Sequence, residues 1–268
     1  MTRKHKILCN INPVGIGIEI GPSYNPIAAK KDGYQVHIID HMSKENLIKK
    51  YENYDVDVRN IEEVDFIWNG QKYSKLTGKV KFYDWIIASH VIEHIPDLIS
   101  FLNDCDEILK NDGVLSLAIP DKRYCFDHYR PPTGISQIID SYYLQNKLHT
   151  PGTMAEYYLN IVSRDGAIAW DKNKEGSDKF LYPLNDVRDK INSIIHKNEY
   201  TDAHAWCFTP NSFRLMIHDL FILGYIPFRE VSFFDTEGCE FFMTLGRQGN
   251  GCTFNRLSLL KFVENETY

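Results

Sequence analysis

Four of the ten histidines lie where acid–base chemistry is expected. His90 and His94 come directly after a β-rich run, His128 follows a later one, and His204 lies where a long helical segment returns to the last elements of the chain. A histidine can take the proton of a hydroxyl group near neutral pH and so make its oxygen a better nucleophile. We therefore interpret His90, His204 and His128, in this order, as candidate general bases; a structural hydrogen-bonding role is the alternative for each.

The stretch GIEIGPSYNP at residues 17–26 ends a β-rich run in a turn that carries one glycine, Gly21. A phosphate-binding loop uses several glycines, and its backbone N–H groups converge on the anion. Pro22 has no N–H and a fixed φ, so this turn disfavours a cofactor that is held by its pyrophosphate. Gly21 still permits close approach of a nucleoside cofactor without phosphates, and Asn25 is expected to cap a short helix that begins at Pro26. A β–α connection without a ligand is the alternative.

Short β-rich runs alternate with helical patterns up to Gly113, an order typical of a parallel sheet with crossover helices. The predicted strands are 15–20, 35–40, 83–89 and 114–119, with a weaker strand near 56–65. Ligands of such sheets bind outside the carboxyl ends of the strands. Asp40 ends the second predicted strand, where a carboxylate can accept hydrogen bonds from both hydroxyl groups of a ribose.

The elements after these strands fall into a helical insertion and a closing unit. Residues 97–113 predict an amphipathic helix that ends at Gly113, and residues 209–224 predict another with Thr209 as its N-cap. The β-rich runs 226–236 and 239–247 indicate a hairpin that closes the sheet.

Residues 121–205 form the insertion, and we expect helices near 134–147, 154–163 and 186–197. We interpret the insertion as a lid that shapes a substrate pocket; a helical extension that only covers the sheet is the alternative. A polar run at its start is interpreted as a pocket edge that binds hydroxyls or an anionic group, with a solvated loop as the alternative: Asp121, Lys122, Arg123, Asp127 and Arg130.

The order of motifs resembles that of class I S-adenosylmethionine (SAM)-dependent methyltransferases. It is carried by IEIGPSYNP, VHIIDH, VDFIW, YDWIIASHVIEHIPD and LKNDGVLSLAIPD, within residues 15–121. The resemblance implies a Rossmann-like α/β fold: a mostly parallel seven-stranded sheet, an antiparallel last strand and a helical insertion after the fifth strand. It also implies one domain over residues 1–268, with a SAM-binding core (15–120), a substrate lid (121–205) and a closing helix and hairpin (206–246).

The resemblance assigns roles to individual residues of the core. It implies that Glu19 and Gly21 lie by the methionine part of SAM and that Asp40 binds the ribose. The family's common first motif, E-x-G-x-G-x-G, carries Ser23 and Asn25 here in place of its second and third glycines. The implied cofactor-binding residues are Glu19, Gly21, Pro22, Ser23, Asn25, Asp40, Asp65, Phe66, Ala88 and Ser89, with Asp65, Phe66, Ala88 and Ser89 beside the adenine.

The segment His90-x-x-Glu93-His94 places three metal-ligand types on one helical face. It resembles the E-x-x-E-H segment of ubiquinone-type O-methyltransferases, a candidate divalent-metal site, with His90 in place of the first glutamate. Because a Glu-His pair at this position is widespread among methyltransferases without a metal, we expect no metal site.

The acceptor is expected to be a sugar hydroxyl of a surface glycan or its precursor. This rests on IPDKRYCFDHYRPPT (119–133) and YTDAHAWCFTP (200–210), which resemble a bacterial subgroup that accompanies glycosyltransferases in surface-polysaccharide synthesis. A glycosyltransferase is then an expected partner. The alternatives are an NAD(P)-dependent Rossmann oxidoreductase and a non-catalytic SAM-fold module that partners a glycosyltransferase.

Composition excludes several other classes of protein. The formal charge of −6 provides no excess of cations for a nucleic-acid partner, and we interpret the basic start MTRKHK as a solvated tail. The six cysteines contain no C-x-x-C pair, so neither a disulfide framework nor a structural zinc site is indicated. With no apolar run long enough to span a bilayer, a cytoplasmic protein is expected.

Overall fold

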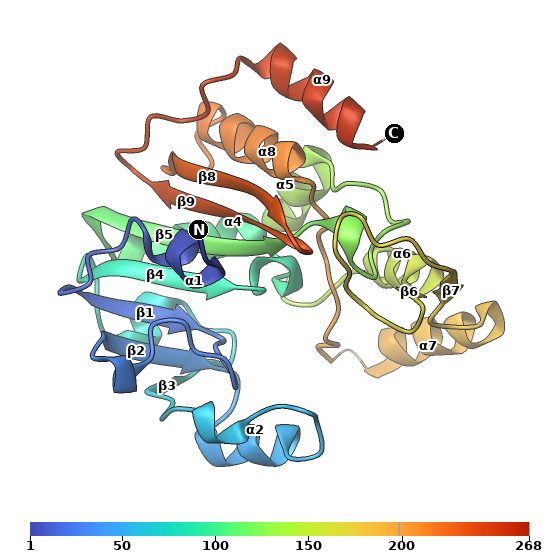
Figure 1. The fold of residues 1–268 in the computed structure, drawn as a ribbon, viewed down its shortest axis with the longest axis horizontal. Coiled ribbons are helices and arrows are strands. Elements are labelled where there is room, and N and C mark those ends of the chain that lie inside the picture. The colour runs from blue at the N-terminus through green and yellow to red at the C-terminus, as the bar shows by residue number, and fades with distance from the viewer. Residues whose placement is uncertain (198, 268) are drawn as a thin grey trace.

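The centre of the protein is a seven-stranded sheet with the order β3-β2-β1-β4-β5-β9-β8, seen in a computed structural model that describes residues 1–197 and 199–267 (Figure 1). β1 to β5 pair in parallel, and β9 is antiparallel to both of its neighbours. This confirms the predicted fold class. The strands are β1 (Ile16–Ile20), β2 (Gln35–Asp40), β3 (Phe66–Ile67), β4 (Tyr83–Ser89), β5 (Leu109–Pro120), β8 (Arg229–Glu237) and β9 (Glu240–Gly246).

Helices cover both faces of the sheet. α4, α5 and α8 pack on one face, and α1 packs on the other with residues 27–28 around the ring of Trp85. Gly17 in β1 makes room for that ring, because a Cβ at this position would lie 2.1–2.2 Å from its atoms. The helices are α1 (Arg3–Leu8), α2 (Lys44–Tyr51), α3 (Tyr73–Thr77), α4 (Leu98–Ile108), α5 (Ile135–Leu144), α6 (Pro151–Asn160), α7 (Leu184–Lys197), α8 (Pro210–Ile222) and α9 (Arg256–Thr267).

The two amphipathic helices form as predicted, with one difference at an end. Thr209 caps α8 by accepting a hydrogen bond from the Ser212 N–H, and the predicted hairpin follows as β8 and β9. α4 buries its predicted apolar face, but it ends at Ile108 and not at Gly113. The chain turns directly into β5 because Leu109, which is buried, pairs with Tyr83 of β4.

Two predicted elements of the first half are wrong. No helix begins at Pro26: the backbone N–H groups of Ile27 and Ala28 donate instead to the buried carboxylate of Glu19, at 2.7 and 3.0 Å, and this holds the segment in irregular form. The weak strand at 56–65 is also absent, because the chain forms the 3₁₀ turn η2 (Val58–Asn60) and enters the sheet only at Phe66.

The basic N-terminus is a folded helix and not a solvated tail. In α1, the guanidinium of Arg3 donates to Glu240 of β9 at 2.6 and 3.0 Å, and the buried ammonium of Lys6 pairs with Glu237. The apolar side of α1 is Ile7, which is fully buried in the core around Trp85. The interpretation of MTRKHK as a solvated tail is therefore wrong: distant acidic partners order it.

The insertion contains the three predicted helices, α5, α6 and α7, and a small two-stranded sheet that the sequence did not predict. That sheet pairs β6 (Val162–Arg164) with β7 (Asp178–Phe180). Figure 1 shows α6, α7 and this sheet beyond the end of the main sheet to which the arrows of β4 and β5 point. The described residues contain no helix that is both long and apolar enough to span a membrane.

Candidate functional site

Strand register brings the ends of three strands together at one edge of the sheet. Ile20, the last residue of β1, pairs with Ile39 of β2 on one side and with Ala88 of β4 on the other. The residues that follow these three positions are Gly21, Asp40 and Ser89, so they leave the sheet at the same level. This is the edge at which ligands of open α/β sheets bind, and it carries most of the predicted cofactor residues.

The turn after β1 has an unusual backbone. Gly21 has φ +62° and Ser23 has φ +46°, which is the left-handed region that favours glycine. Its first hydrogen bond ties it to β2, because the Gly21 N–H donates to the Ile39 carbonyl at 2.8 Å. The Asn25 N–H donates to the carbonyl of Pro22 and closes the turn, and the Asn25 side chain is exposed. Ser23, which stands where the common motif has a glycine, thus has a left-handed backbone that glycine adopts without strain.

Asp40 fastens the end of β2 to this turn. Its carboxylate is buried and accepts two hydrogen bonds from His41, one from the backbone N–H at 2.7 Å and one from Nδ1 at 2.6 Å. The other carboxylate oxygen accepts a longer bond of 3.3 Å from the N–H of Ser23. The Ser23 hydroxyl lies 3.4 Å from the Tyr51 hydroxyl of α2. The carboxylate of Asp40 is therefore held beside the turn, and its second oxygen accepts only the long hydrogen bond from Ser23.

Glu19 lies one residue before the end of β1 and is 2% exposed. Burial raises its pKa to about 7, although hydrogen bonds from the Ile27 and Ala28 N–H groups act in the opposite direction. Both of its oxygens are used by these backbone groups. The structure therefore gives Glu19 a definite role in shaping the loop after the turn.

Asp65 and Phe66 lie before the carboxyl edge of β3 and not beyond it. The Asp65 carboxylate accepts hydrogen bonds from the Ile38 N–H inside β2, at 2.7 Å, and from Lys30 at 2.6 Å. The Phe66 ring packs edge to face against His37, with ring centroids 5.5 Å apart. At the end of the strand itself stands Ile67, whose side chain is about half exposed. Neither predicted side chain shares the edge with Gly21 and Asp40.

Ser89 ends β4 and His90 follows it, within a polar cluster that includes Arg3 of α1. His90 has φ +53°, and its Nε2 lies 2.8 Å from Glu240 of β9. Arg3 donates to the same carboxylate and to the hydroxyl of Ser89, at 2.8 Å. Burial opposes ionisation of Glu240, but the hydrogen bonds from His90 and Arg3 outweigh it and lower its pKa to about 2. Ala88, just before Ser89, is buried in the core.

Glu93 is the centre of a histidine cluster at this edge. It lies in the 3₁₀ turn η3 (Ile92–His94), its side chain is 1% exposed, and neither carboxylate oxygen has a hydrogen-bond partner among the described residues. Its Oε1 lies 3.6 Å from Nδ1 of His90, 4.0 Å from Nε2 of His94 and 4.0 Å from Nε2 of His204. Two of the three predicted bases, His90 and His204, thus face the same carboxylate.

The polar run at the start of the insertion supports this cluster from behind. Asp127 is 1% exposed and accepts a hydrogen bond from Nδ1 of His204. Arg130, also 1% exposed, donates to Asp127 at 2.9 Å, to the His204 carbonyl at 2.8 Å and to Glu156 of α6 at 3.2 Å. Burial raises the pKa of Asp127, but His204 and Arg130 outweigh it and hold the value at about 2.

The other residues of this run are also bound within the protein. Asp121 is held by Arg123 and by the hydroxyl of Thr236, and Lys122 donates to the carbonyl of His128. The charged groups that we expected to bind a ligand therefore form hydrogen bonds within the protein.

His128 lies apart from the histidine cluster. Its Nδ1 lies 2.6 Å from the Arg123 carbonyl, to which it donates, and its ring packs near Tyr129 and Trp170. No hydrogen bond or ion pair among the described residues joins it to His90, Glu93 or His204. Of the three predicted bases, it is the one that the fold does not bring to the cluster.

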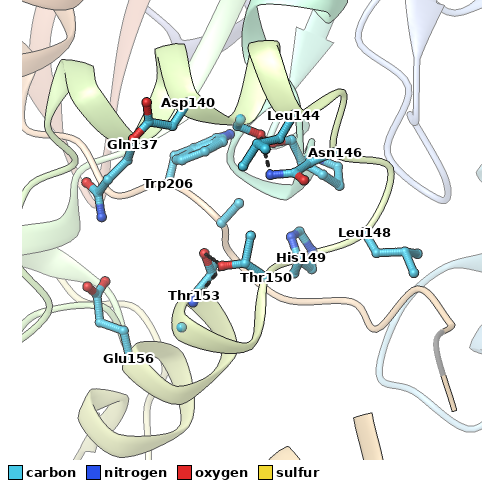
Figure 2. A pocket seen from close by; sticks show the side chains of 14 residues that line it. Gln137, Asp140, Leu144, Asn146, Leu148, His149, Thr150, Thr153, Glu156 and Trp206 are labelled. Carbon is cyan, nitrogen blue, oxygen red and sulfur yellow. Dashed lines mark hydrogen bonds between the residues drawn. The ribbon is translucent and has the colours of Figure 1, made fainter. Parts of the chain in front are cut away.

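A cavity of about 240 Å³ opens between α5 and α6, next to the cluster (Figure 2). Ala205 and Trp206 line it, and the N–H of Ala205 donates to the backbone carbonyl of Glu93 at 2.6 Å. Figure 2 shows Gln137 and Asp140 on one side, Thr153 and Glu156 on the other, and Trp206 and His149 between them. The polar side chains that line it are Gln137, Asp140, Ser141, Asn146, His149, Thr150, Thr153 and Glu156.

His149 has an exceptional environment in this cavity. Its side chain is buried, and neither ring nitrogen has a hydrogen-bond partner among the described residues. Burial and the nearby charge of His94 lower its pKa to about 4, so its ring is neutral at physiological pH. A neutral imidazole has one N–H donor and one acceptor nitrogen available.

Sequence reasoning missed several residues that complete the site. The expected polar edge did contain Asp127, but not its partnership with His204, and nothing singled out Arg3, Asp202 or Glu240. Arg3 and Glu240 are far apart in the chain. The pairing of β9 with β5 places Glu240 beside His90, where Arg3 also contacts it, and the sequence does not show this pairing. The available signal for Asp202 was its place two residues before His204 in YTDAHAW.

Comparison with known proteins defines the family. Residues 12–160, more than half of the chain, match the family model described as a methyltransferase domain. No protein of curated function matches the sequence. Among solved structures, one described as a putative zinc-dependent alcohol dehydrogenase from Rhodobacter sphaeroides has 12% identity and a TM-score of 0.50 over 92% of this chain and 89% of its own.

Two further solved structures are SAM-dependent methyltransferases by description. The one from Methanosarcina mazei has 14% identity and a TM-score of 0.47, and covers 91% of this chain and 97% of its own. The other, a possible histamine N-methyltransferase from Thermotoga maritima, has 20% identity and a TM-score of 0.32 over 44% of this chain and 51% of its own. At these identities structural likeness concerns the fold alone, so the family model decides: the chain belongs to the SAM-dependent methyltransferases, and SAM is its cofactor.

Proposed function

We propose that this methyltransferase transfers the methyl group of SAM to a sugar hydroxyl, in a surface glycan or its precursor. The observation that supports a sugar most directly is the cavity between α5 and α6, where polar side chains and the indole of Trp206 surround His149. A buried His149 whose nitrogens have no hydrogen-bond partner in the described part of the chain is costly unless a ligand binds it, and a hydroxyl group can both donate to it and accept from it.

The size and lining of the cavity favour one small, hydroxyl-rich unit. Its volume of about 240 Å³ is below the range of about 300–1,000 Å³ that is usual for pockets of drug-sized ligands. Such pockets combine an apolar lining with a small number of polar groups, and here these include carboxylates from Asp140 and Glu156 and amides from Gln137 and Asn146. These groups match the donors and acceptors of adjacent hydroxyls, and Trp206 offers an apolar face to the sugar's C–H groups.

The SAM site in this proposal is the edge with Gly21, Asp40 and Ser89. Asp40 would bind the ribose, and the turn at Gly21 and Ser23 would lie against the methionine part. Pro22 has no backbone N–H, so the turn has one donor fewer for a phosphate group. The side chains of Asp65 and Phe66 contact β2, so they would help to bind the adenine indirectly, by fixing the position of β3. Methyl transfer from a sulfonium is an in-line displacement, so positioning of the acceptor oxygen supplies much of the rate.

His90 is the first candidate for the base that removes the hydroxyl proton. Its side chain is 40% exposed at the end of β4, and Glu240 fixes the ring through Nε2, which leaves Nδ1 as the nitrogen that accepts a proton. The proton would move from the acceptor oxygen to Nδ1 as the oxygen–methyl bond forms and the sulfonium–methyl bond breaks. His204 is the second candidate, and its contact with Asp127 provides the same kind of orientation. His128 ranks last because it lies apart from both.

The decisive experiment is methyl transfer from isotopically labelled SAM to a panel of nucleotide sugars and oligosaccharides, read by mass spectrometry. We expect one added methyl group on a sugar oxygen. His149→Phe should raise the acceptor KM about tenfold or more, because it removes a hydrogen bond at a buried polar group. Asp140→Ala should also raise it about tenfold, because it removes a charged hydrogen-bond acceptor from the rim of the cavity. The affinity for S-adenosylhomocysteine should stay unchanged in both. Asp189→Ala, on an exposed face of α7, is the matched control.

Other outcomes would identify the alternatives. Binding of S-adenosylhomocysteine with no methylated product in any acceptor class would favour a non-catalytic module that partners a glycosyltransferase. Methylation of a nitrogen or of a non-sugar acceptor, insensitive to Asp140→Ala and His149→Phe, would refute the sugar proposal but leave the family assignment intact. Thermal stabilisation by NAD(P) and not by SAM would support the oxidoreductase alternative.

A further inference from the structure

We propose that Glu93, His94 and His204 bind a divalent metal ion of the zinc type at the carboxyl edge of the sheet. One oxygen of Glu93 and one ring nitrogen of each histidine lie within 4.8 Å of one another. This differs from the metal-free site expected from the sequence, and the ligand set also differs from the H-x-x-E-H segment. His204, which comes from the end of the insertion, supplies a ligand that the segment lacks.

The unpaired carboxylate of Glu93 is the observation that points to a cation. Glu93 is fully enclosed, and both of its oxygens lack hydrogen-bond partners among the described residues. An ionised carboxylate in such a place is very unfavourable unless a positive charge compensates it. The arginine in the vicinity, Arg130, points to Asp127, Glu156 and the His204 carbonyl. A bound cation would compensate the charge of Glu93 from within the cluster.

The outer nitrogens of both histidine ligands face carboxylates. Nδ1 of His204 donates to Asp127, and Nδ1 of His94 lies 2.8 Å from a carboxylate oxygen of Asp202. The hydrogen bond to Asp127 holds the proton of His204 on Nδ1 and directs the lone pair of its Nε2 toward Glu93. Nδ1 of His94 is close to Asp202 but does not have hydrogen-bond geometry with it. Such a carboxylate behind the histidine is the usual support of histidine ligands, because it fixes the tautomer and the ring orientation.

The distances suit a small ion after modest closure. Each imidazole nitrogen lies 4.0 Å from Oε1 of Glu93. Metal–ligand bonds of about 2.0–2.2 Å at tetrahedral angles place donor atoms about 3.4 Å apart. Each histidine nitrogen would therefore move roughly half an ångström closer to Glu93, and the two histidine nitrogens, which lie within 4.8 Å of each other, would approach by up to about 1.4 Å. Two nitrogens and one carboxylate match Zn²⁺, Co²⁺, Mn²⁺ or Fe²⁺, and not the all-oxygen sites that Mg²⁺ and Ca²⁺ prefer. Three protein ligands leave at least one position open.

An open position would give the ion a chemical use. A hydroxyl bound to such a cation loses its proton at lower pH than a free one, and His90 Nδ1 lies 3.6 Å from the same Glu93 oxygen. This use depends on the proposed function, but the binding of the metal does not. Metal binding is therefore tested without an acceptor.

The experiment measures the metal alone. Chelator-treated protein is titrated with Co²⁺, followed by its visible absorption, and with Zn²⁺ by calorimetry, and bound metal is counted by elemental analysis. We expect one ion per chain. Glu93→Gln and His204→Ala each remove a proposed ligand. They should lower the affinity of the protein for the metal at least about 10- to 100-fold, which is the loss that removal of a residue supporting a ligand typically causes. Asp202→Asn, whose side chain is 72% exposed and so does not risk the fold, should lower it about tenfold.

The controls separate a specific site from adventitious binding. His218→Ala removes a histidine that also pairs with an aspartate, Asp219, but lies on α8 outside the cluster, so it should bind the metal as the wild type does. Binding of S-adenosylhomocysteine serves as the test of folding in every variant. The proposal is overturned if the wild type binds no stoichiometric Co²⁺ or Zn²⁺, or if Glu93→Gln and Asp202→Asn bind them as tightly as wild type. Sugar methylation by a metal-free protein would leave the proposed function standing.

Discussion

Replacing Asp40 by asparagine is expected to weaken binding of S-adenosylhomocysteine by about 10- to 150-fold. The ionised carboxylate has about four lone-pair positions, and the protein itself uses three of them: two bonds from His41 reach one oxygen, and the Ser23 N–H reaches the other at 3.3 Å. One position, on the oxygen nearer the turn, is left for a ribose hydroxyl.

The magnitude follows from that one free position. A hydrogen bond to a charged group contributes about 1.5–3 kcal/mol, which corresponds to a factor of about 10–150 in the dissociation constant. In Asp40→Asn, the carbonyl oxygen is expected to keep the bonds from His41, so the amide NH₂ would face the Ser23 N–H and the ribose. Two donors would then oppose each other, and the hydroxyl would lose its acceptor.

Isothermal titration calorimetry of S-adenosylhomocysteine measures this loss, and Asp84→Asn is the matched control. Asp84 belongs to β4 of the same sheet and also accepts bonds from a backbone N–H, that of Ile16, and from a charged group, Lys110, but it lies at the opposite end of its strand. We expect Asp84→Asn to change stability but not affinity. If a folded Asp40→Asn variant binds within about threefold of wild type, the assignment of the ribose to Asp40 is refuted.

Two further predictions concern the turn and the loop after β1. Ser23→Gly should raise the free energy of unfolding by about 1 kcal/mol, because it relieves a left-handed backbone; urea denaturation that shows a loss instead would mean that the contact with Tyr51 dominates. Burial raises the pKa of Glu19 from 4.5 to about 7, so its stabilising contribution is complete below pH 4.5 and is lost as the pH rises through 7. Wild type should therefore lose stability relative to Glu19→Gln across this window, on the order of 3 kcal/mol, and a difference that stays flat with pH would contradict the assignment.

Most of the parallel sheet could be predicted because its strands are buried runs with turn residues at their ends. The bounds of β2 and β4 match the predicted 35–40 and 83–89, and the apolar face of α4 was readable from its spacing. β3 was misplaced because it has only two residues, too few for a pattern. The roles that the resemblance gave to Asp65 and Phe66 beside the adenine stay predictions; their side chains contact β2 and Lys30 in the structure.

The failures at other positions have a common physical cause: a charged partner outside the local segment, eight or nine residues away for Glu19 and 237 residues away for Glu240. Local propensity favours a helix at Pro26, but the carboxylate of Glu19 takes the N–H groups that such a helix needs. The pattern of MTRKHK alone predicts a solvated tail, but in the structure Arg3 of this segment binds Glu240. Local patterns describe such segments correctly only where no charged group from outside the segment competes for their hydrogen bonds.

The same dependence explains why the histidine cluster was only half visible from the sequence. His90 and Glu93 are neighbours in the chain, but His204 reaches them because the insertion returns along Ala205, whose N–H binds the carbonyl of Glu93. Consecutive residues thus serve two proposed sites: His204 faces Glu93, while Ala205 and Trp206 line the cavity. Metal binding and acceptor binding are therefore close in space yet open to separate tests by substitution, since Asp202 lies beside His94 of the first site and Asp140 lines the second.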